Sequence, residues 1–75
     1  MYKLLVFCKP PDLDKRSISA KFKLKEVLTN ERTCILENDD IVFSIDKKVV
    51  RVFLYNESDK MLLHTVEEYF YGKQH

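Results

Sequence analysis

Alternating apolar and polar positions along the chain predict β-strands, because successive side chains of a strand point to opposite faces of the sheet. Short polar segments separate the alternating stretches. The first alternating stretch ends at Pro10 and Pro11, and Asn38, Asp39 and Asp40 form a typical turn sequence later in the chain. Five stretches carry this signal: residues 2–9, 18–25, 33–37, 41–46 and 49–55.

The stretch 18–25 fits two periods. As a helix it would group Ala20 with Leu24 but would leave Ile18 and Phe22 elsewhere. As a strand it separates all the apolar residues from all the polar ones, and we therefore predict a strand. On that strand Lys21, Lys23 and Lys25 form a row on the face opposite Ile18, Ala20, Phe22 and Leu24.

The last part of the chain has the period of a helix. Asn56 and Ser58 are suitable N-cap residues before it, and Gly72 stands where a C-terminal glycine would end it. Its apolar stripe consists of Leu62, Leu63, Val66, Tyr69 and Phe70.

The elements together predict one small α+β domain over residues 1–75: an antiparallel sheet or curled half-barrel of about five strands, followed by one C-terminal helix. Strands 2–9 and 49–55 are apolar on both faces, and one helix covers only one face of a sheet. We therefore expect a second cover, either from closure of the sheet into a small barrel or from a second chain.

Composition narrows the class of protein. The 75 residues are 45% hydrophobic and 33% charged with a net charge of +1, which is typical of a globular domain and not of a disordered chain. No apolar run reaches the length of a membrane span, and we expect a cytoplasmic protein with no membrane partner. In such a compartment Cys8 and Cys34 are expected to be buried, reduced thiols.

The residues that usually carry chemistry are scarce. A single glycine leaves no phosphate-binding loop of the common kinds. The two histidines, His64 and His75, are not spaced from the two cysteines as a catalytic base is from its nucleophile or as the ligands of a zinc site are from one another. His64 is expected to pair with Glu68 one helical turn later. We expect no cofactor, no metal and no catalytic residue, hence not an enzyme.

Five basic residues within a short segment are the first candidate site: Lys15, Arg16, Lys21, Lys23 and Lys25. A lysine row on a strand can protect a sheet edge, bind an acidic protein, or follow a phosphate backbone. Residues 1–29 carry seven basic and three acidic side chains, whereas residues 30–46 carry one and five. This polarity would orient a partner.

Tyr55 and Tyr71 are the second candidate site, because tyrosine offers apolar area and a polar group at interfaces. The function we expect is a small protein-binding module without catalysis, a regulator or inhibitor of a larger complex, whose partner is an acidic protein or a second copy of the chain. Exposed strand edges could also accept a partner strand. The alternative is a nucleic-acid-binding domain that uses the lysine row.

Overall fold

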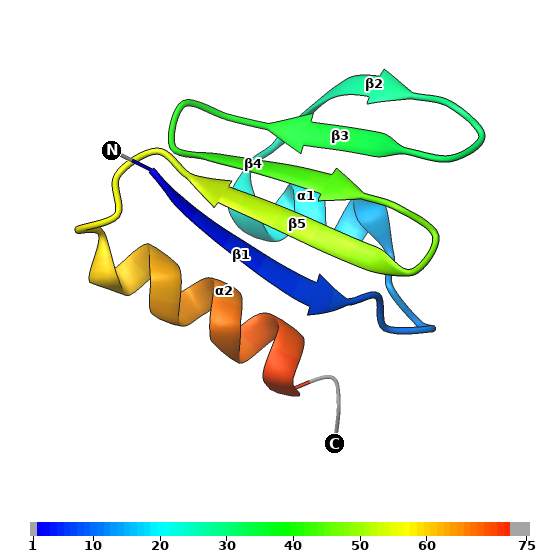
Figure 1. Ribbon diagram of the computed structural model, residues 1–75. Helices are drawn as coiled ribbons and strands as arrows, with labels where there is room; N and C mark the ends of the chain where they lie inside the picture. The colour runs from blue at the N-terminus through cyan, green and yellow to red at the C-terminus, as the bar shows by residue number, and fades with distance from the viewer. Residues whose placement is uncertain (1, 73–75) are drawn as a thin grey trace.

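The computed structural model describes residues 2–72 as an antiparallel sheet with two helices (Figure 1). This confirms the predicted α+β class, with an open sheet and not a barrel. The elements, in chain order, are β1 (Lys3–Cys8), α1 (Lys15–Phe22), β2 (Lys25–Thr29), β3 (Cys34–Glu37), β4 (Ile41–Ile45), β5 (Val49–Leu54) and α2 (Lys60–Gly72).

The sheet has the strand order β1-β5-β4-β3-β2, and every neighbouring pair is antiparallel. The chain crosses from one edge of the sheet to the other through α1, because β1 and β2 are the two outermost strands. It then returns through three consecutive hairpins, and β5 pairs with β1. This arrangement leaves two free strand edges, which differ in character.

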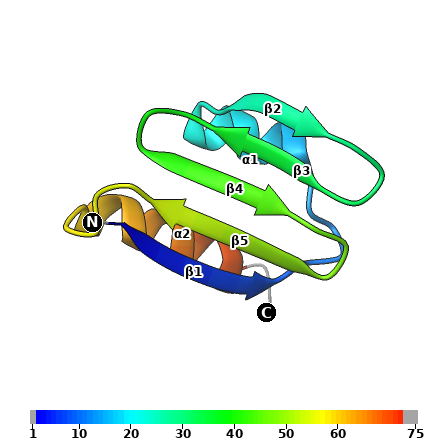
Figure 2. The same cartoon turned by 45° about the horizontal axis from the view of Figure 1, so that its top comes forward.

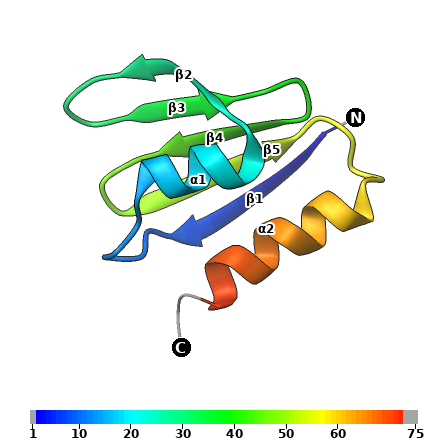
Figure 3. The ribbon, with the colours of Figure 1, turned by 180° about the vertical axis from the view of Figure 1, so that it is seen from behind.

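Both helices lie on the same face of the sheet. Figure 2 shows them behind the strands, and Figure 3, seen from behind, shows them in front. The buried core lies between the sheet and this helical layer. Its members are Phe7, Ile18, Phe22, Leu36, Ile41, Phe43, Ile45, Val50, Val52, Leu54, Val66 and Phe70.

Phe43, at the centre of β4, connects both helices to the sheet. Its ring centroid lies 5.0 Å from that of Phe22 in α1 and 6.1 Å from that of Phe70 in α2. Phe70 also stacks on Phe7 of β1, with ring centroids 4.5 Å apart. Aromatic pairs at these separations contribute about 0.5–1.5 kcal/mol each beyond the burial of their area.

The prediction of a strand over 18–25 is wrong, because α1 occupies most of this stretch. Ile18 and Phe22 are four positions apart, a spacing that fits one face of a helix as well as one face of a strand. In the helix both are buried, while Ala20 is exposed. The second strand of the fold instead begins at Lys25, the last residue of the predicted strand, and continues to Thr29, where no strand was predicted.

Local capping explains where α1 begins and ends. Asp14 is the N-cap, and its side chain accepts a hydrogen bond of 2.9 Å from the Arg16 N–H. At the other end Lys23 adopts the left-handed conformation with φ 58°, and Asn38 Nδ2 donates a bond of 2.8 Å to the Phe22 carbonyl. The side-chain oxygen of Asn38 also accepts from the Ile41 N–H, so one residue closes the β3–β4 turn and holds the helix end.

The C-terminal helix is confirmed, but its predicted cap is not. The carboxylate of Asp59 accepts a 3.1 Å hydrogen bond from the Leu62 N–H, which makes Asp59 the capping residue. Asn56 acts one turn earlier, where its side chain accepts from the Ser58 N–H. Gly72 is the last helical residue and has no positive φ.

Candidate functional site: the uncovered face of the sheet

The second face of the sheet carries apolar side chains that nothing in residues 2–72 covers. On β1, Leu4 is 46% exposed and Val6 is 58% exposed. Phe53 of β5 and Val42 of β4 lie opposite one another on this face and are half-buried by their neighbours. The sheet is open and both helices pack on its other face, so closure into a barrel does not supply the second cover that the sequence predicts. Cover by a second chain stays a prediction.

Two tyrosines extend this apolar surface at the end where β1 begins and β5 ends. The ring of Tyr2 lies 5.8 Å from that of Phe53, tilted by 50°. Tyr2, Val42, Phe53 and Tyr55 line a shallow hollow of about 310 Å³. Tyr55 is 51% exposed. We call the surface formed by Tyr2, Leu4, Val6, Val42, Phe53 and Tyr55 the open face.

Polar groups border the open face. Beyond Tyr55 lies a second hollow, of about 440 Å³, that is lined by Lys25, Glu37, Asn38 and Asp39. On the same face Arg51 of β5 stands directly opposite Val6 of β1, and its Nη1 lies 3.7 Å from Asp46 Oδ2, an ion pair that is about half exposed. An apolar centre with a polar border is the usual anatomy of a protein-binding surface.

The basic candidate residues do not form a row on one strand. Lys15, Arg16 and Lys21 belong to α1 on the helical side of the sheet, and Lys23 is the residue that ends this helix. Only Lys25 lies in a strand, at the outer edge of the sheet and directly opposite Glu37. The predicted ladder is wrong because the segment that carries it is helical. Whether these side chains bind a partner stays a prediction.

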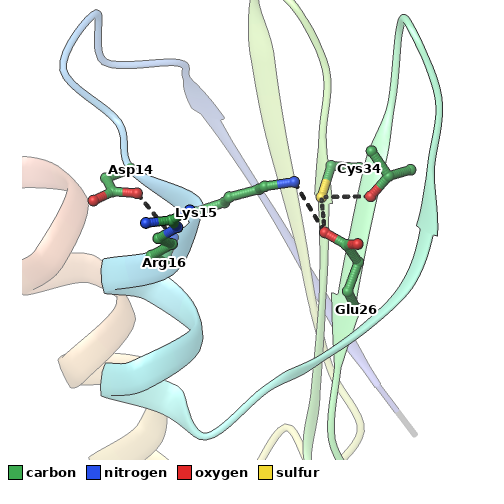
Figure 4. Close-up of polar contacts among 6 residues, drawn as sticks. Asp14, Lys15, Arg16, Glu26 and Cys34 are labelled. Carbon is green, nitrogen blue, oxygen red and sulfur yellow. Dashed lines mark hydrogen bonds and ion pairs between the residues drawn. The ribbon is translucent and has the colours of Figure 1, made fainter.

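Lys15 is engaged within the chain. Its Nζ lies 3.0 Å from Glu26 Oε1, which joins α1 to the edge strand β2 (Figure 4). This hydrogen bond and the attraction between the two charges lower the pKa of the Glu26 carboxyl and raise the pKa of the Lys15 ammonium. Cys34 Sγ contacts the same carboxylate oxygen at 3.9 Å.

The two tyrosine candidates lie on opposite sides of the molecule. Tyr55 borders the open face, whereas Tyr71 belongs to α2 and its ring packs edge-on against Phe7, with centroids 5.5 Å apart. The structure therefore places only Tyr55 in the candidate site. Leu4, Val6 and Phe53 were not proposed as site residues from the sequence, although the doubly apolar pattern of their strands is the signal that identifies them.

The two cysteines lie on strands that are not neighbours in the sheet. Cys8 is exposed, contrary to the expectation of burial, and Cys34 is half-buried; both are free, and β5 and β4 separate their strands in the sheet. His64 Nε2 lies 3.4 Å from Glu68 Oε2, which confirms the predicted pair, and His75 lies outside the described residues. Residues 2–72 contain no cluster of three His, Cys, Asp or Glu side chains that could hold a metal ion.

Comparison with protein-family models, with curated proteins and with solved structures finds no match for this chain. The described helices are all too short or too polar to cross a membrane. The functional interpretation consequently rests on the open face and on the strand edges beside it.

Proposed function

We propose that this chain is a small protein-binding module without catalytic activity, and that it binds a partner protein through the open face. The single observation that carries the proposal is the row of exposed apolar side chains on the sheet face opposite both helices. Monomeric proteins seldom leave a large contiguous apolar patch in water, and such patches mark interaction surfaces.

The size of the surface fits this role. The molecule is 33 × 30 × 20 Å, and all five strands belong to one sheet. Five strands about 4.8 Å apart and about five residues long give the sheet face a planar area of roughly 400 Å², which is the scale of the smaller, transient class of protein–protein interface. The exposed tyrosines Tyr2 and Tyr55 supply the residue type that most often dominates binding energy.

More specifically, we propose that the chain is a regulator or inhibitor of a larger protein complex and that it acts in the cytoplasm. One face of the sheet packs the core that stabilises this chain of 75 residues, and the other face is the one proposed for binding. The two free cysteines fit a reducing compartment.

The test is affinity capture from an extract of the organism that encodes the chain, treated with nuclease and washed at low and at high salt. We expect one protein to remain bound in near-stoichiometric amount after both washes, because apolar contacts weaken little with added salt. Loss of all bound material after nuclease treatment, with recovery of nucleic acid at low salt, would instead support the nucleic-acid alternative. Capture of neither class would contradict the proposal.

A further inference from the structure

The free edge of β1 has its main-chain groups turned outward at alternate residues. The Lys9 N–H donates a 2.9 Å hydrogen bond to the Lys48 carbonyl, and the register continues in steps of two along β1 and β5. In an antiparallel pair the residues that exchange both hydrogen bonds alternate with residues that face away. The outward-facing positions of β1 are therefore Leu4, Val6 and Cys8.

Between Leu4 and Cys8 this edge lacks the charges, prolines and bulges that normally prevent strand addition. The β1–β5 register is unbroken, and no charged residue interrupts the stretch from Leu4 to Cys8. The opposite edge, β2, has a register shift between Glu26 and Leu28 and contains a lysine and a glutamate within its five exposed residues. Bulges and charges of this kind block unwanted pairing. The β2 edge therefore has the features of a protected edge, and the β1 edge between Leu4 and Cys8 does not.

Main-chain pairing at this edge would extend the open face. The residues with outward main-chain groups, Leu4 and Val6, are also the ones whose side chains lie on that face. In an antiparallel pair, side chains directly opposite one another are about 4.5–5.5 Å apart at Cβ. A strand added here would place every second side chain beside Leu4 and Val6, with Phe53 one strand further on in β5.

Charge selects the occupant. Lys3 and Lys9 stand at the two ends of β1, Lys47 and Lys48 follow in the adjoining turn, and β1 carries no acidic residue. A second copy pairing through its own β1 would bring these lysines toward one another, which is unfavourable. An extended segment with acidic residues at both ends would meet them with opposite charge.

From these observations we propose that β1 accepts an extended segment of the partner protein as a sixth strand, with apolar residues at alternate positions and acidic residues at both ends. This inference rests on the proposed function and specifies how the partner is recognised. Main-chain hydrogen bonds would supply affinity, and the alternate side chains on the open face would supply specificity.

The probe is a synthetic nonapeptide with three valines alternating with two threonines and two aspartates at each end. We expect its addition to shift the NMR signals of the Leu4, Val6 and Cys8 amides and to slow their exchange with solvent. The same peptide with lysines in place of aspartates should bind at least tenfold more weakly. Without peptide, sedimentation should show a monomer, and NMR should show fast exchange of the Val6 amide hydrogen with solvent.

Val6→Pro tests the main-chain mechanism, because it removes an N–H that β5 does not use, and proline is tolerated on edge strands at such positions. We expect at least a tenfold loss of peptide affinity, while Val6→Thr, which keeps the N–H, retains most of it. A peptide methylated at its valine nitrogens should fail against the unaltered protein, which keeps the test valid if the proline variant does not fold.

Three results would overturn the inference: no binding of the aspartate peptide at millimolar concentration, equal binding of the lysine peptide, or a dimer whose Val6 amide is protected without peptide. The last would show that a second copy occupies the edge. None of these results depends on the capture experiment, so strand addition can fail while binding through the open face stands.

Discussion

Phe43→Ala is expected to remove most of the stability of this domain. Phe43 is fully buried at the centre of β4 and contacts aromatic rings from both helices, so its loss opens a cavity that neither layer can fill. Substitutions of this kind cost about 3–5 kcal/mol, and a single core in a chain of this size rarely supplies more than about 3–5 kcal/mol. Far-UV circular dichroism during a urea titration measures the loss.

Phe53→Ala is the matched control, since it removes the same side chain from the adjacent strand on the other face of the sheet. Phe53 is half-buried, and the free energy of unfolding should fall by about 1 kcal/mol, from a partial loss of apolar burial. An equal loss from the two substitutions would show that the open face is covered in the free protein, contrary to the structure.

Tyr55→Ser is expected to weaken binding of the captured partner by about thirtyfold, a loss typical of a tyrosine that contributes strongly to an interface. Tyr55 borders the hollow beside Tyr2 and Phe53 and has no role in the helical core. Binding of the purified partner, measured by calorimetry on variants with unchanged circular dichroism, gives the ratio.

Tyr71→Ser provides the control, because Tyr71 is as exposed as Tyr55 but lies in α2, on the far side of the sheet. Its substitution should change partner affinity less than twofold, with a small loss of stability from its contact with Phe7. The reverse pattern, in which only Tyr71→Ser weakens binding, would place the interface on the helical side.

Most of the sheet could be predicted from the sequence, because alternation is unambiguous where apolar residues occur at successive steps of two. The four strands β1, β3, β4 and β5 lie within their predicted ranges. Helix α1 could not be recognised in this way, since Ile18 and Phe22 satisfy both periods and Ala20 is compatible with either environment. The Asp14 cap and the left-handed Lys23 that define this helix are local features, which periodicity does not detect.

The candidate site was predicted only in part. The sequence shows that the second apolar face of β1 and β5 needs a cover. It does not show which face of the sheet the helices pack against, because that depends on tertiary packing. The lysine ladder was derived from the strand assignment, and it was lost when residues 15–22 proved helical. Tyr55 and Tyr71 were equivalent by type and exposure, and only the fold separates them.

The central claim is that a partner protein binds the open face. Its most direct test is photo-crosslinking in the native extract, with a benzophenone amino acid in place of Leu4 on that face or in place of Met61, which is 83% exposed on α2. The account predicts a single covalent protein adduct from the Leu4 position and none from the Met61 position. Adducts from Met61 alone, or from neither position, would contradict it.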